Sequence, residues 1–181
     1  NFAENQQRSP DYLKMNPKGR VPVLVDGDVV VTENPAILYY VAQKFPDANL
    51  WPRDLKDRAA CLEWCAFMSS TVHVTYAHIR RAERYATGDD AIANVQAKGK
   101  LTTREVWEMV ESKLGKGPWA LGDTYSMADP YLLVFWNWGR GAVLGYDMAK
   151  DFPNWTAHAR RMAARPAVQR AFAAEGLELP A

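Results

Sequence analysis

The sequence has few cysteines, almost no excess charge and no long apolar run. Its 181 residues include two cysteines, and 22 basic residues stand against 21 acidic ones, which leaves a net charge of +1. Nucleic acids and anionic membranes recognise clustered positive charge, so we expect neither nucleic acid nor a membrane as a partner. No apolar run approaches the roughly 18 residues of a membrane-spanning helix. With little cysteine and no visible signal peptide, the chain is expected in the cytoplasm.

The sequence also lacks the common motifs of metal and nucleophile chemistry. Cys61 and Cys65 lie one helical turn apart, but no second ligand pair has zinc spacing, so buried core thiols are the better interpretation. His73 and His78 would point about 140° apart on a helix and cannot share a metal. No Gly-x-Ser-x-Gly elbow and no phosphate-binding glycine loop occurs. We therefore expect no metal and cannot assign a nucleophile from motifs.

The only convincing strands lie near the start of the chain. β-branched runs at residues 21–25 and 29–32 flank Asp26-Gly27-Asp28. An Asp-Gly turn between such runs predicts an antiparallel hairpin.

A helix should follow the hairpin, with Asn34 as its N-cap, Pro35 in its first position and its end at Pro46. Two strands do not make a stable sheet without a third strand or a packing helix. The chain also opens with Asn1 rather than Met. We therefore expect that it begins partway through a longer protein and that a βαβ unit precedes it.

The sequence after Trp51 has helical periodicity throughout. The predicted helices cover residues 55–85, 91–114, 126–138, 154–164 and 167–175. On the first of these, residues at helical spacing should share one buried face: Leu62, Cys65, Ala66, Ser69, Val72, His73, Tyr76 and Ile79. We therefore expect domains at 1–47 and 55–181, joined by a linker at 48–54.

Ser126 and Asp129 have the spacing of a structural capping box at the start of an apolar helix. The Ser126 hydroxyl can accept a hydrogen bond from the Asp129 backbone N–H, while the Asp129 carboxylate reaches back to the Ser126 N–H. This pair is expected to stabilise the helix rather than to perform chemistry.

The most specific signal joins Val21-Pro22 to Glu33-Asn34. A proline entering a strand removes a ladder donor, so the Val21 backbone is available to an extended peptide. Backbone N–H groups at the start of the next helix favour a carboxylate, and Glu33 can bind an ammonium group beside it. Together these features suggest a receptor for an amino-acid head group with a peptide tail. The alternative is a plain strand entry followed by a plain helix cap.

With these motifs in order, the sequence resembles the cytosolic glutathione transferases, and most closely their bacterial beta class. The matching segments span essentially the whole chain: residues 16–24, 32–37, 63–64, 126–132, 162–169 and 174–177. The resemblance implies an α+β thioredoxin-like N-terminal domain, incomplete in this chain, and an all-α C-terminal helical bundle. It also implies a cytoplasmic homodimer, glutathione as co-substrate, a role in detoxification and a cis Val21-Pro22 bond.

The resemblance also implies roles for individual residues. Val21 and Pro22 would contact the cysteinyl part of glutathione, and Glu33 and Asn34 its γ-glutamyl end. On the long helix, Ser70 and His73 fall in the glutathione-binding segment, with His73 near the sulfur. The family's thiol-activating Cys, Ser or Tyr would precede Asn1, so no catalytic nucleophile contact is assigned and His73 is the supporting candidate.

Two further sets of residues complete the expected site. The family lysine at the glycyl carboxylate aligns near Glu4 and Asn5, and Arg8 or Arg20 would replace it. An apolar pocket for the electrophile would be lined by Tyr76, Phe135 and Trp138, for which interhelical core is the alternative.

The leading hypothesis is transfer of the glutathione thiolate to small hydrophobic electrophiles. Two alternatives stay open. The chain could be a non-catalytic binding or scaffold module of the same fold. It could also reduce mixed disulfides or peroxides with glutathione, if the preceding segment carries a cysteine.

Overall fold

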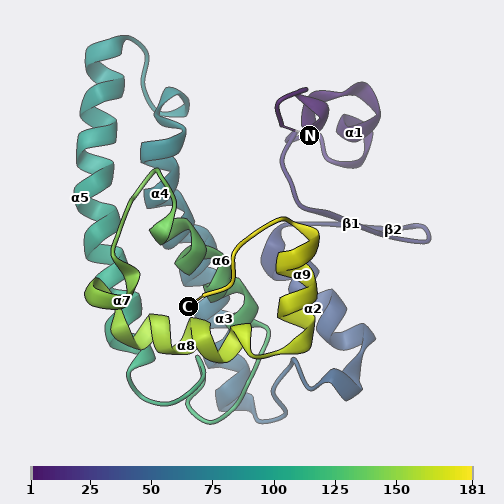
Figure 1. Ribbon diagram of the computed structural model, residues 1–181. Coiled ribbons are helices and arrows are strands. Elements are labelled where there is room, and N and C mark those ends of the chain that lie inside the picture. Colours follow the sequence, from purple (N-terminus) through teal and green to yellow (C-terminus); the bar gives the residue numbers. More distant parts are fainter. Residues whose placement is uncertain (1, 181) are drawn as a thin grey trace. The chain divides into compact units, whose positions relative to one another are not determined.

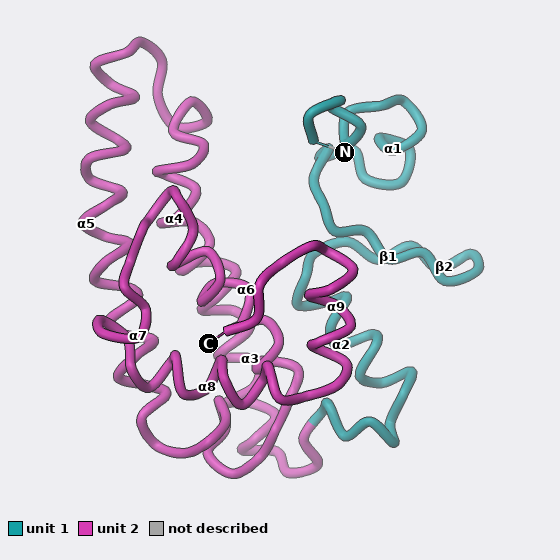
Figure 2. Tube along the Cα trace, viewed as in Figure 1, with its two compact units in different colours: residues 1–51 teal, residues 52–181 magenta. Residues whose placement is uncertain are grey.

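The computed structural model describes residues 2–180, and the chain divides into two compact units (Figure 2). The first unit is Asn1–Trp51 and the second is Pro52–Ala181, so the division falls inside the segment predicted as a linker. The first unit contains a small antiparallel sheet with helices, and the described part of the second is helical apart from isolated bridges.

The N-terminal unit is built around a β-hairpin. Its elements are η1 (Gln6–Arg8), α1 (Pro10–Met15), β1 (Val23–Asp26), β2 (Val29–Thr32), α2 (Asn34–Lys44) and η2 (Pro46–Ala48). The strands pair antiparallel, as predicted, with Val23 opposite Thr32 and Asp26 opposite Val29. Gly27 adopts φ 61° in the turn, a left-handed conformation that glycine takes without a steric penalty.

Two boundaries in this unit differ from the prediction. β1 begins at Val23 rather than at residue 21, because Pro22 has no N–H to donate to a strand ladder. The Val21-Pro22 bond is cis, as the resemblance implies. α2 begins at Asn34, so the prediction of Asn34 as N-cap is wrong. Glu33 takes the cap position with φ 70° and ψ 119°, and its side chain does not cap the helix.

The Asp26 carboxylate, at the hairpin turn, connects the strands to α2. Tyr40 Oη donates to Asp26 Oδ2 at 2.8 Å, and Lys44 forms an ion pair with the same oxygen. These contacts from Lys44 and Tyr40 hold the pKa of Asp26 below its usual value. Because Tyr40 and Lys44 are one helical turn apart, both reach Asp26 from one face of α2.

The second unit is a bundle of helices (Figure 1), and its core is rich in aromatic side chains. Its elements are α3 (Leu55–Phe67), a π-helical turn η3 (Met68–Val72), α4 (His73–Arg80), η4 (Ala82–Arg84), α5 (Asp89–Leu114), α6 (Ala128–Arg140), α7 (Met148–Asp151), α8 (Pro153–Ala163) and α9 (Pro166–Ala174). Helix α5 packs against α4 and α8, and α6 packs against α8. Trp64, Trp107 and Trp155 are almost completely buried between these helices. Within residues 2–180, none of the helices combines the length and the apolar character needed to span a bilayer.

The helix predicted over residues 55–85 is helical as far as Arg80 but is not a uniform α-helix. The π turn inserts an extra residue, so it rotates the side chains that follow relative to those that precede. The predicted buried stripe is partly wrong on both sides of this turn: Leu62 is 51% exposed and Ala66 is exposed before it, and His73 is exposed after it. The buried face consists of Cys61, Trp64, Cys65, Met68, Val72, Ala77 and Ile79.

The carboxylate of Asp129 is fully buried and connects three parts of the helical unit. It accepts hydrogen bonds from the backbone N–H groups of Ser126 at 2.7 Å and Ala120 at 2.8 Å, and lies 2.8 Å from His158 Nε2 on α8.

One half of the predicted capping box is thus present. In the other half, the Ser126 hydroxyl accepts from the Ala128 N–H instead of the Asp129 N–H. Asp129 therefore does more than cap α6, because it also holds the 118–125 connector and α8.

We predict that Asp129→Ala lowers the free energy of unfolding by about 3 kcal/mol or more, because it leaves several buried polar groups without an acceptor. Urea denaturation of the variant and the parent measures the difference. Asp54→Ala is the matched control, since Asp54 only caps the exposed start of α3 by accepting from the Lys56 N–H at 2.9 Å. That control should lose about 1 kcal/mol. Equal losses in the two variants would show that the contacts of Asp129 to Ala120 and His158 add nothing.

A second prediction concerns Gly117, directly before the 118–125 connector. A Cβ at this position would lie 2.6 Å from Gly122 Cα, where Trp119 and Gly122 exchange two backbone hydrogen bonds. Backbone cannot move aside as a flexible side chain can, so Gly117→Ala should destabilise the unit by about 1–3 kcal/mol. In Gly115→Ala, the closest atom to the new methyl group is the Asn154 amide nitrogen at 3.1 Å, and that side chain can move. A smaller loss for Gly117→Ala than for Gly115→Ala in the same denaturation assay would show that the close approach of residue 117 to the Gly122 backbone does not limit stability.

Candidate functional site

The loop before β1 is organised by a buried asparagine. Asn16 is 1% exposed; its Nδ2 donates to the Arg20 carbonyl at 2.6 Å and its Oδ1 accepts from the Lys18 N–H at 3.2 Å. The Tyr12 hydroxyl donates to the same Arg20 carbonyl at 2.7 Å. These bonds fix the backbone immediately before Val21.

Val21 is presented at the surface by this loop. The residue is 51% exposed, and its backbone N–H and C=O have no hydrogen-bond partner within residues 2–180. An extended peptide could therefore pair with the Val21 backbone without displacing an existing bond. This is the feature that the sequence predicted for Val21 and Pro22.

The start of α2 offers both a carboxylate and unpaired backbone donors. Glu33 leaves its carboxylate side chain 68% exposed, and its backbone carbonyl accepts the Ile37 N–H. The N–H groups of Asn34 and Ala36 have no hydrogen-bond partner among the described residues. Since the N-terminus of a helix carries partial positive charge, these donors favour an anion beside Glu33.

Lys18 is a charged neighbour of this position that the sequence reasoning missed. Its Nζ donates to Thr32 Oγ1 at 3.0 Å and forms an ion pair with Glu33 Oε1. Fifteen residues separate Lys18 from Glu33, and only the fold of the loop and hairpin brings them together. Its place in the Asn16-to-Pro22 loop, beside the predicted site, is the one sequence signal that could have pointed to it.

The two arginines proposed for the glycyl carboxylate differ in their surroundings. The Arg8 side chain lies against Gly19, where an added Cβ would be 2.9 Å from Arg8 Cδ. Arg20 is exposed and is fixed through its backbone carbonyl. Their proposed role, like that of the region around Glu4 and Asn5, stays a prediction.

In the helical unit, the predicted residues gather beside the π turn. The hydroxyls of Ser69 and Ser70 both donate to the Ala66 carbonyl, at 3.1 and 2.8 Å. π turns within α-helices occur frequently at functional sites. His73 follows the turn directly and is exposed, so Ser70 and His73 lie on an accessible part of the helix.

His73 belongs to a cluster of aromatic rings. Its ring centroid lies 5.3 Å from that of Trp138 and 6.0 Å from that of Phe135, both edge-on, and the Tyr76 and Trp138 centroids are 4.6 Å apart. Phe135 is 0% exposed and belongs to the core, whereas Tyr76 and Trp138 are half-buried. Burial raises the pKa of Tyr76. Tyr76 and Trp138 are therefore the members able to meet a ligand.

The cysteines are placed as core thiols. Cys61 and Cys65 are 0% and 1% exposed. The pKa of Cys65 is raised strongly by its hydrogen bond to Cys61 and by burial, so the thiol stays protonated. Within residues 2–180, no group of three or more His, Cys, Asp or Glu side chains is arranged to hold a metal ion.

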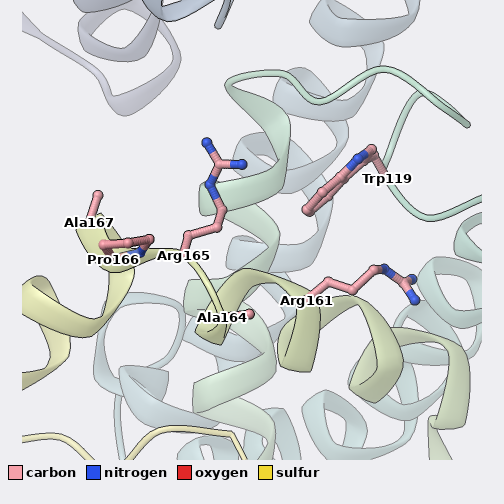
Figure 3. Close-up of a pocket in the computed structure, with 6 residues that line it drawn as sticks. All are labelled: Trp119, Arg161, Ala164, Arg165, Pro166 and Ala167. Atoms are coloured by element: carbon pink, nitrogen blue, oxygen red, sulfur yellow. The ribbon is translucent and has the colours of Figure 1, made fainter.

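A separate hollow of about 490 Å³ lies on the helical unit and contains none of the predicted site residues (Figure 3). Its lining comprises Trp119, Arg161, Ala164, Arg165, Pro166 and Ala167. The Arg165 guanidinium carbon lies 3.8 Å from the centroid of the Tyr125 ring, and Arg161 Nε donates to the Pro118 carbonyl. Both arginines thus have structural contacts to the connector.

Comparison with known sequences finds the same family at both ends of the chain. Residues 1–43 match the glutathione S-transferase N-terminal domain, and residues 65–166 match the glutathione S-transferase C-terminal domain. Glutathione S-transferase GST-4.5 of Xanthomonas campestris is 34% identical over 171 residues, which are 94% of this chain and 82% of that protein.

Solved structures agree with this assignment. A glutathione transferase homologue from Sulfitobacter with bound glutathione is 38% identical, with a TM-score of 0.89 over 98% of this chain and 84% of its own. A beta-class glutathione S-transferase from Sphingomonas chungbukensis is 34% identical, with a TM-score of 0.77 over 93% of this chain and 80% of its own. The predicted fold class is confirmed by these neighbours. By sequence and by fold, the chain belongs to the glutathione S-transferase family of enzymes.

Proposed function

We propose that this chain binds glutathione along the Val21 backbone and the start of α2, and joins the whole glutathione molecule through its sulfur to a small hydrophobic electrophile. The observation that carries the proposal is the unpaired Val21 backbone in the same unit as the exposed Glu33 carboxylate and the unpaired N–H groups of α2. The glutathione bound to the 38% identical Sulfitobacter homologue supports it.

Each part of this surface suits one part of the tripeptide. The Val21 N–H and C=O would pair with the cysteinyl residue, as in strand addition. Glu33 would bind the γ-glutamyl ammonium group, and the N–H groups of Asn34 and Ala36 its α-carboxylate. For the glycyl carboxylate, Arg8 and Arg20 remain the proposed partners.

Chemistry requires the thiolate form of glutathione, which is a far better nucleophile than the thiol. We propose that His73 supports this form and that Ser70 contributes to binding. Of the three predicted pocket residues, Tyr76 and Trp138 are proposed to line the electrophile pocket, and the buried Phe135 is proposed to support their rings from behind. The aromatic ring contacts around His73 support this assignment. We also propose the homodimer that is general for this family.

We predict that the protein is retained on glutathione-agarose and is eluted by free glutathione. Retention is expected because the head-group and backbone contacts all lie in the surface described above. A column of the same matrix without glutathione is the control. Failure to bind the glutathione column would remove the basis of the proposal.

Transfer and reduction are separated by two assays on the retained protein. Conjugation of a chloronitrobenzene with glutathione should proceed faster than reduction of a glutathione mixed disulfide. Cys61 and Cys65 are buried and supply no accessible thiol for disulfide exchange. The opposite ranking of rates would favour the reductase alternative, and binding without either activity would favour a binding module.

We predict that Glu33→Gln raises the KM for glutathione by about tenfold, because it removes the charge that faces the ammonium group. Steady-state kinetics at saturating electrophile measures the change. Asp28→Asn removes a carboxylate from the exposed hairpin turn of the same unit and serves as the control. If both variants kept the parent KM, the assignment of the head-group site to Glu33 would be wrong.

A further inference from the structure

We infer that Lys18 is a second charged contact for the amino-acid end of glutathione, so that Lys18 and Glu33 together form a receptor for its α-ammonium and α-carboxylate groups. This inference rests on the proposed function and adds a specificity-determining residue to that site. Lys18 would donate to the α-carboxylate, and Glu33 would accept from the ammonium group.

The Lys18 ammonium is held in place by two acceptors. Its Nζ donates to Thr32 Oγ1 at 3.0 Å and to Glu33 Oε1. A lysine ammonium has three N–H donors, so one remains for a ligand. Glu33 likewise retains Oε2, which takes no hydrogen bond from a residue of the described chain.

The backbone beneath Lys18 is also fixed. The Lys18 N–H donates to the buried Asn16 side chain, and the Gly19 N–H donates to the Asn16 carbonyl at 2.9 Å. Thr32 lies at the end of β2, directly before Glu33. The loop and the hairpin therefore hold the ammonium and the carboxylate side by side before any ligand arrives.

The charges of this pair match those of the ligand. An α-amino acid head group carries an ammonium and a carboxylate on one carbon atom. Glu33 alone would attract the ammonium but repel the carboxylate beside it. Lys18 removes that repulsion and, with the unpaired N–H groups of Asn34 and Ala36, places positive charge where the carboxylate would lie. Because the pair has no net charge, it favours a zwitterion over a simple anion or cation.

Calorimetric titration with three ligands tests the inference. The ligands are glutathione, its glutaryl analogue that lacks the α-amino group, and its 4-aminobutyryl analogue that lacks the α-carboxylate. Lys18→Met should weaken binding of glutathione and of the glutaryl analogue by about tenfold and leave the 4-aminobutyryl analogue unchanged. Glu33→Gln should show the complementary pattern, with weaker binding of glutathione and of the 4-aminobutyryl analogue only.

Two further variants control for charge and for folding. Lys18→Arg keeps the positive charge and should restore most of the glutathione affinity. Lys14→Met removes a lysine from another exposed ion pair of the same unit, that of Lys14 with Asp11, and should bind all three ligands like the parent. Circular dichroism melting of each variant separates lost binding from lost folding.

Each other outcome overturns the inference. If Lys18→Met left the glutathione affinity unchanged, the Lys18–Glu33 pair would be an ordinary surface ion pair without a role in binding. Tighter binding would show that Lys18 competes with the ligand ammonium for the Glu33 carboxylate. An equal loss for all three ligands would show that the lysine does not contact the α-carboxylate. If the parent itself bound no glutathione, the proposed function would fail, whereas binding that is insensitive to Lys18 would refute only the role of Lys18.

Discussion

The helical unit depends on one buried carboxylate. Asp129 accepts hydrogen bonds from the Ser126 and Ala120 backbone and contacts His158, so it joins the start of α6 to the connector and to α8. A buried carboxylate is costly unless its oxygens are matched by donors, and here the Ser126 hydroxyl adds a fourth, longer contact of 3.4 Å to the three already named. α6 in turn carries Phe135 and Trp138, the rings against which His73 packs. The network thus fixes the helix that supports the proposed aromatic surface.

In the N-terminal unit, Asn16 has the corresponding role on a smaller scale. The Asn16 side chain forms hydrogen bonds with the backbone of Lys18 and Arg20, and its carbonyl accepts from the Gly19 N–H. Val21 follows this loop, and its backbone has no hydrogen-bond partner among the described residues. Backbone groups that are held rigidly but left without partners are suited to binding a peptide, because little conformational entropy is lost when the peptide pairs with them.

The sequence was sufficient for the hairpin and for most of the longer helices, because turn chemistry and apolar spacing are local signals, but the short helices α1 and α7 were not predicted. It failed where the outcome depends on backbone geometry. In α3 the buried face runs through Cys61, Trp64 and Cys65, so Leu62 is exposed, and the π turn at Met68–Val72 then rotates the face that continues into α4. Glu33, not Asn34, occupies the cap position because its dihedral angles are not helical. Lys18 was missed because its contact with Glu33 is made across the loop and hairpin, and its place in the Asn16-to-Pro22 loop does not by itself indicate that contact.

The conformation of Glu33 itself argues for a function of its side chain. A φ of 70° favours glycine, and for other residues such a conformation costs on the order of 1–3 kcal/mol. Glycine at this position would relieve the strain but would remove the carboxylate. The side chain does not cap α2, and its exposed ion pair with Lys18 is worth at most about 1 kcal/mol, which does not clearly offset the strain. A strained, exposed carboxylate beside the unpaired N–H groups of a helix start is therefore better explained by a ligand than by stability.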